Sequence, residues 1–135
     1  MNSSILHTKK LCKTFSNSGT QQHVIKNLDL EIYKGDFTVI MGSSGSGKTT
    51  LLNCISTIDT VTDGSIFVGA EDITKINKTK LTSFRREKLG FIFQQFNGCV
   101  MLFRTLNGNV FGYVYTLASA VVTLSGVSLG IFVGQ

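Results

Sequence analysis

A glycine-rich segment from Gly42 to Thr49 holds the residues of this 135-residue chain whose types and spacing are best suited to chemistry. It matches the phosphate-loop pattern G-x-x-x-x-G-K-[ST] at every fixed position. Glycines in such a loop let backbone N–H groups approach phosphate oxygens without an intervening Cβ atom. We expect Lys48 to reach the β- and γ-phosphates of a nucleotide and the Thr49 hydroxyl to bind Mg²⁺. The pattern therefore predicts a site for a magnesium nucleotide.

The segments on either side of the loop fit this prediction. Phe37–Met41 is a continuous apolar run, typical of a strand buried on both faces, and helical spacing of apolar residues follows at 49–58. Such a helix directs its free N–H groups and the positive end of its dipole at the same phosphates. Thr50 adds a donor toward the α-phosphate. The predicted nucleotide contacts in the loop are Gly42, Ser43, Ser44, Gly45, Ser46, Gly47, Lys48, Thr49 and Thr50.

The rest of the first hundred residues predicts an α/β fold. Residues 5–15 and 23–33 alternate loosely between apolar and polar, as antiparallel strands with one solvated face do, and Ser16–Gly19 reads as the turn between them. The remaining predicted elements are a short strand at 65–68, a polar helix at 78–89 and a buried strand at 90–93.

Charge is distributed unevenly along the chain. The 13 basic and 8 acidic side chains, which give a net charge of +5, all lie at or before Arg104. Val110–Val133 is an uncharged segment rich in Phe, Val and Leu. A helix of this length would reach roughly 36 Å, enough to cross the apolar core of a bilayer. We therefore expect an apolar C-terminal helix over 110–133.

Several other chemistries find little support. Cys12, Cys54 and Cys99 form no C-x-x-C pair, so neither a zinc site nor a disulfide framework is indicated. A GTPase is excluded because Asn77–Lys80 lacks the final Asp of an N-K-x-D motif. The basic stretch Lys75–Lys88 is explained more simply as a solvated helix face than as a nucleic-acid surface.

Five segments occur in the order and at the intervals of one known family. They are Val24–Leu30, Lys34–Asp36, Val39–Asn53, Asp63–Ile66 and Leu89–Gln94. Together they resemble the opening of an ABC-transporter ATP-binding domain, most closely the branch that exports antimicrobial peptides, lipoproteins or macrolides. The resemblance covers roughly residues 5–97 and implies a P-loop NTPase-like core with ATP and Mg²⁺ as cofactors.

The resemblance implies two further site residues. Phe15 stands where the family has an aromatic residue that stacks on adenine, and the face of its ring suits that role. Gln94 matches the Q-loop glutamine, which touches Mg²⁺ and the attacking water, so Thr49 and Gln94 are the predicted metal ligands. The partners implied are a transporter membrane subunit and a second nucleotide-binding domain, at the cytoplasmic side of the cell membrane.

After Asn97 the resemblance stops. The family continues to an L-S-G-G-Q signature, a Walker B Asp-Glu pair and a switch histidine, none of which occurs here, and no acidic residue follows Glu87. We therefore predict no catalytic residue and do not expect this chain alone to hydrolyse ATP. We divide the chain into a truncated N-terminal nucleotide-binding portion at 1–97 and an apolar tail at 98–135.

The tail has three explanations. It is a frameshifted sequence, a membrane anchor formed by the helix at 110–133, or a buried element that replaces lost strands. Two functions are compatible with the sequence. The first is an ATP-binding subunit of an ABC-type exporter. The alternative is a non-catalytic interaction protein or a non-functional remnant of a disrupted transporter gene. The transported substrate and the oligomeric state are not encoded in these residues.

Overall fold

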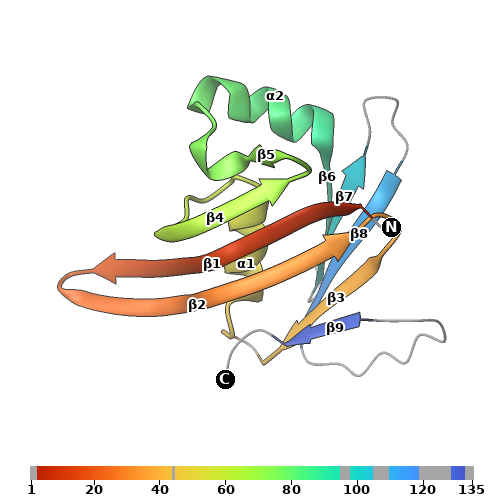
Figure 1. Ribbon diagram of the computed structural model, residues 1–135. Coiled ribbons are helices and arrows are strands. Elements are labelled where there is room, and N and C mark those ends of the chain that lie inside the picture. The colour runs from red at the N-terminus through yellow and green to blue at the C-terminus, as the bar shows by residue number, and fades with distance from the viewer. Residues whose placement is uncertain (1–2, 44, 95–97, 105–109, 119–128, 133–135) are drawn as a thin grey trace.

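The computed structural model describes residues 3–43, 45–94, 98–104, 110–118 and 129–132, which form two sheets, two α-helices and a short 3₁₀ turn (Figure 1). The elements in chain order are β1 (Ser4–Asn17), β2 (Thr20–Tyr33), β3 (Phe37–Gly42), α1 (Lys48–Ile55), β4 (Asp63–Val68), β5 (Glu71–Asp72), the 3₁₀ turn Ile73–Lys75, α2 (Lys78–Lys88), β6 (Leu89–Gln94), β7 (Gly98–Arg104), β8 (Val110–Ala118) and β9 (Leu129–Phe132).

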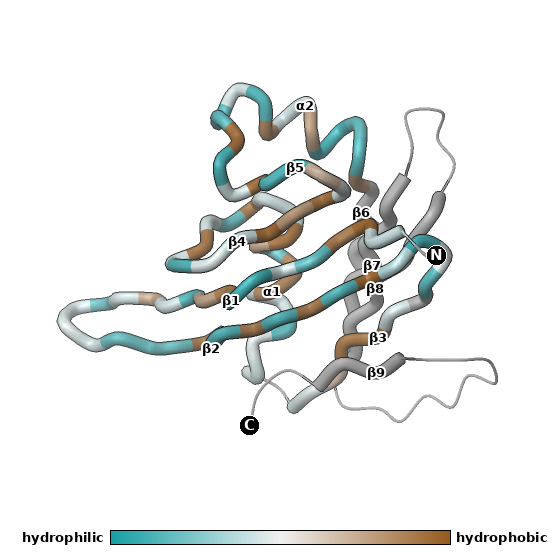
Figure 2. Tube along the Cα trace, in the orientation of Figure 1, coloured by the Kyte–Doolittle hydropathy of each residue, from teal (hydrophilic) through white to brown (hydrophobic). Residues whose placement is uncertain are grey.

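The first sheet is antiparallel and has the strand order β2-β1-β4-β5. Strands β1 and β2 form a long hairpin, paired from Ser4 with Tyr33 to Asn17 with Thr20, so the predicted strand pair is confirmed. The turn between them is shorter than predicted, because Ser16 and Asn17 still belong to β1. Figure 1 shows this hairpin extending away from the second sheet. Its far end is pale to teal in Figure 2, whereas brown, apolar residues gather where β1, β4 and α1 overlap.

Helix α1 supplies much of the core against the first sheet. Its apolar residues at helical spacing are almost inaccessible to solvent, and so are their partners on β1, β2 and β4. Full burial of each such side chain contributes roughly 1.5–3 kcal/mol. Burial on this scale anchors the helix that begins at the phosphate loop. The fully buried aliphatic side chains of this core are Leu6, Leu11, Ile32, Ile40, Leu51, Ile55 and Ile66.

Helix α2 and the strands β4 and β6 match the predictions closely, whereas β5 and the 3₁₀ turn were not predicted. The helix begins after Asn77, whose side chain accepts a hydrogen bond from the Thr79 N–H, and its last turn carries Arg85, Arg86 and Lys88. Cations there favour the negative end of the helix dipole. Figure 1 shows α2 above β5, at the edge of the first sheet.

The second sheet has the order β6-β7-β8-β3-β9, with β3 parallel to both β8 and β9. The apolar helix that we expected over 110–133 is therefore wrong where the structure describes the chain, because Val110–Ala118 and Leu129–Phe132 are strands. The run is rich in β-branched and aromatic residues, which favour strands. Residues 119–128 and 133 lie outside the described part.

No helix among the described residues is long and apolar enough to cross a membrane. The predicted anchor is thus without support in that part of the chain. The division into 1–97 and 98–135 stays a prediction.

Candidate phosphate-binding site

The glycine-rich segment connects the end of β3 to the start of α1. Strand β3 ends at Gly42 and α1 begins at Lys48, as the sequence predicted. Within the loop the Ser46 N–H donates to the Ser43 carbonyl at 3.1 Å, and the Leu51 N–H closes the first helical turn on the Gly47 carbonyl at 2.8 Å. The loop therefore places a helix N-terminus beside the carboxyl end of a strand, which is an arrangement suited to anions.

Two glycines of the loop have left-handed backbone conformations for different reasons. Gly45 has φ +79° and no atom within 4 Å of an added Cβ, so its outer side is open. Gly47 has φ +99°, and a Cβ there would lie 2.9 Å from Val24 Cγ1 on β2. Positive φ favours glycine at both positions, but only Gly47 also lacks the space for a side chain.

Lys48 is the most informative side chain of the loop. It is only 7% exposed, and its ammonium donates to the carbonyls of Gly42 and Ser43 at 2.6 Å each and to Ser46 Oγ at 3.1 Å. These three partners match the three N–H donors of an ammonium group. Every acidic side chain lies within the described residues, and none forms an ion pair with Lys48. The loop thus holds a nearly dehydrated positive charge that has no counter-ion among the residues that the structure describes.

The helix start adds to this positive potential. The first turn of α1 contains no acidic residue, so its free N–H groups and dipole are not neutralised. Thr49 is exposed and Thr50 half-buried, so both hydroxyls lie near the surface at the helix N-terminus. Ser44 lies outside the described residues. The arrangement favours an anion with several oxygens.

Phe15 lies on β1, towards the turn of the β1–β2 hairpin. It is 41% exposed on the far part of β1, where it pairs with Gln22. Val24, which contacts Gly47, falls between the pairs Lys13–Ile25 and Thr14–His23. The exposed ring therefore belongs to the part of the hairpin that adjoins the loop.

Gln94 is the last residue of β6 and pairs with Gly98 of β7. The structure does not describe its side chain, so its place near the loop and its metal role stay predictions. Among the described residues no group of three His, Cys, Asp or Glu side chains is arranged to hold a metal ion.

Sequence reasoning missed Lys13. Its side chain is 7% exposed, and its ammonium lies 2.8 Å from Asp59 Oδ1 and 2.5 Å from the Thr60 carbonyl. The hydrogen bond from Lys13 is the main reason that the pKa of Asp59 lies below its ordinary value. The only sequence signal was a lysine at an inward position of an alternating strand.

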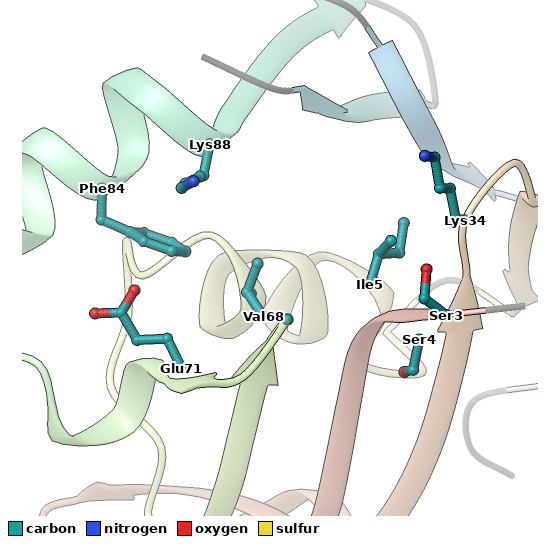
Figure 3. Close-up of a pocket in the computed structure, with 9 residues that line it drawn as sticks. Ser3, Ser4, Ile5, Lys34, Val68, Glu71, Phe84 and Lys88 are labelled. Atoms are coloured by element: carbon teal, nitrogen blue, oxygen red, sulfur yellow. The ribbon is translucent and has the colours of Figure 1, made fainter.

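A separate pocket of about 370 Å³ opens between the start of β1, the end of β4 and α2 (Figure 3). It shares no residue with the predicted nucleotide contacts. The residues that line it are Ser3, Ser4, Ile5, Lys34, Val68, Gly69, Glu71, Phe84 and Lys88.

Comparisons with known proteins agree with the loop and its surroundings. Residues 25–121 match the ABC transporter family. Over 93 residues the chain is 43% identical to the bacitracin export ATP-binding protein BceA of Halalkalibacterium halodurans and 46% identical to the ABC transporter ATP-binding protein YxdL of Bacillus subtilis. These alignments cover 69% of this chain but only 37% and 36% of the two relatives, so the chain spans about a third of their length.

A solved structure shows the same likeness in three dimensions. The dimeric structure of MJ0796, a bacterial ABC transporter cassette, superposes with a TM-score of 0.64 at 39% identity, covering 68% of this chain and 40% of that one. The resemblance that we described from the sequence is thereby confirmed: this chain belongs to the ABC transporter family.

Proposed function

We propose that this chain binds MgATP through Gly42–Thr50 and serves as an ATP-binding part of an ABC-type exporter. The proposal rests on the buried Lys48 ammonium, which has hydrogen-bond partners but no counter-ion in the described part of the chain. A charge in such surroundings is costly unless it is paired. A phosphate group supplies the missing charge, and Lys48 then exchanges at least one loop partner for a phosphate oxygen.

The residues present fit the nucleotide. Gly45 leaves the outer side of the loop free of a side chain, and the α1 N-terminus offers N–H donors that have no partner within the helix. Mg²⁺ bound to the phosphates neutralises part of their charge. We assign the Thr49 hydroxyl to that ion, with Gln94 as the second ligand and Phe15 as the base-stacking ring.

The exporter role rests on the relatives. Their names include bacitracin export and macrolide export proteins, the latter MacB of Campylobacter fetus at 41% identity over 93 residues, covering 69% of this chain and 14% of that protein. The dimeric MJ0796 cassette supports pairing with a second nucleotide-binding domain. A membrane subunit is the other expected partner, which locates the chain at the cytoplasmic side of the membrane.

Binding rather than turnover is the activity that we assign to these 135 residues. They contain no acidic residue after Glu87, and none of the signature or switch segments of the family. The alternative role as a non-catalytic interaction protein or a remnant is not favoured, because the phosphate loop keeps its full pattern and its expected geometry.

The direct test is calorimetric titration of the purified chain with MgATP. We compare wild type with Lys48→Ala and with the control Lys80→Ala, which removes the same charge from an exposed position on α2. Loss of a charge-assisted hydrogen bond weakens binding by about 10- to 150-fold. Saturable binding that Lys48→Ala weakens and Lys80→Ala leaves unchanged supports the proposal. Equal binding by all three proteins contradicts it.

A further inference from the structure

Lys13 connects two parts of the molecule that are distant in sequence. It belongs to β1, and its ammonium reaches Asp59 and the Thr60 carbonyl, which follow the C-terminal end of α1. The Thr60 N–H in turn donates to Asp59 Oδ1 at 2.8 Å, so the carboxylate that receives the ammonium is itself held. The ammonium therefore has a well-defined position despite its long side chain.

The same ammonium lies over the ring of Phe15, 4.8 Å from its centroid. This distance is within the range of about 6 Å in which a cation is attracted to an aromatic face. Phe15 is nevertheless 41% exposed. The ring therefore has a cation over one face and keeps a large accessible surface.

This arrangement suits the binding of a flat ligand. A ring held by a neighbouring cation loses less side-chain freedom when it binds, so stacking on it has a smaller entropic cost. A cation on one face also draws electron density from the ring, which favours an electron-rich base on the other face. Lys13 is anchored to the segment that follows α1, and α1 begins at the phosphate loop. The ring is therefore tied to the element that positions the phosphates.

We infer that Lys13 is a positioning residue that holds Phe15 as the platform for the purine base. The inference rests on the proposed binding of MgATP at Gly42–Thr50. If Lys13 instead serves only the ion pair with Asp59, removing it changes stability but leaves the contribution of the base to binding unchanged.

The test separates the base from the phosphates by using two probes, MgATP and magnesium tripolyphosphate, in calorimetric titrations. We expect Lys13→Met to weaken MgATP binding about threefold to tenfold while tripolyphosphate binds as tightly as to wild type. Phe15→Ala likewise weakens the binding of MgATP and leaves the binding of tripolyphosphate unchanged. The double variant binds MgATP no more weakly than Phe15→Ala alone, because Lys13 acts through the ring.

Two further variants keep the test decisive if Lys13→Met unfolds. Lys13→Arg retains a cation and is expected to keep most of the preference for MgATP, and Asp59→Asn, which keeps Lys13 but loosens its anchor, lowers that preference partially. Three results would overturn the inference. Lys13→Met could keep the wild-type preference for MgATP over tripolyphosphate, it could bind both probes equally more weakly, or the losses of MgATP affinity from the two single substitutions could add up in the double variant. If wild type binds neither probe, the proposed function itself fails.

Discussion

Gly47 lies against Val24 so closely that an added Cβ atom would come 2.9 Å from Val24 Cγ1 and 3.2 Å from the Val24 carbonyl oxygen. This contact joins the last glycine of the phosphate loop to strand β2, where the register of the β1–β2 hairpin shifts. The loop is therefore positioned by the hairpin as well as by the strand and helix that it connects. The last glycine of the motif serves both the backbone conformation and this packing.

Gly47→Ala is expected to destabilise the protein more than Gly45→Ala does. Both positions have positive φ, which costs a residue with a side chain roughly 1–2 kcal/mol. At Gly47 the new methyl group also collides with Val24, which adds about 1–3 kcal/mol, as overpacking does. Urea unfolding of the two variants measures the difference. Equal losses of stability would show that the Val24 contact has no energetic weight.

Thr57→Gly is expected to stabilise the protein by about 1 kcal/mol. Thr57 follows the C-terminus of α1 with φ +63°, an unfavourable conformation for a β-branched residue, and its buried Oγ1 has no hydrogen-bond partner. Glycine relieves both costs and keeps the carbonyl that accepts from Arg85. Thermal unfolding gives the measurement.

The control for Thr57→Gly is Ser56→Gly at the neighbouring residue. Ser56 has φ −82°, so glycine relieves no strain there and removes the hydrogen bond from Ser56 Oγ to the Asn53 carbonyl. We expect this variant to be less stable than wild type. Stabilisation by both variants, or by neither, would contradict the assignment of strain to Thr57.

The Asp59–Lys13 pair makes stability depend on pH. Pairing with Lys13 lowers the pKa of Asp59 in the folded protein. The stabilisation by the pair is therefore present above the ordinary pKa of an aspartate, about 4. It is lost as the pH falls through the lower pKa that Asp59 has in the folded protein. Asp59→Asn should therefore cost about 1 kcal/mol at pH 7 and progressively less in acid. Urea unfolding from pH 7 to pH 2 tests this.

Glu87→Gln serves as the control for that series, because Glu87 is an exposed carboxylate on α2 and the change in charge is the same. The difference in stability between Glu87→Gln and wild type should vary little between pH 7 and pH 2. A constant difference between wild type and Asp59→Asn at every pH would exclude the ion pair as the cause.

Local sequence patterns predicted the elements that form the loop. The apolar run before Gly42 and the helical spacing of Leu51, Leu52 and Ile55 correspond to β3 and α1, and the conformation of the loop follows from its glycines. These features depend on residues close together in the chain. Residue type and spacing were therefore sufficient to identify them.

Features that depend on distant partners were not predictable in this way. The run from Val110 has no charged position and no clear alternation of polar and apolar residues, so its length suggested a helix, whereas pairing with β3 makes Val110–Ala118 a strand. Lys13 likewise meets Asp59 across 46 positions of sequence, and nothing near either residue indicates the other. Only the folded chain shows these relationships.

The measurement that tests the central claim most directly is an amide NMR titration of the labelled chain with MgATP. The account predicts that the largest shifts occur at Gly45, Ser46, Gly47 and Lys48, which form the loop. The amides of Ser4 and Gly69, which line the separate pocket, should change little. Binding that shifts the pocket amides and leaves the loop unchanged would contradict nucleotide binding at Gly42–Thr50.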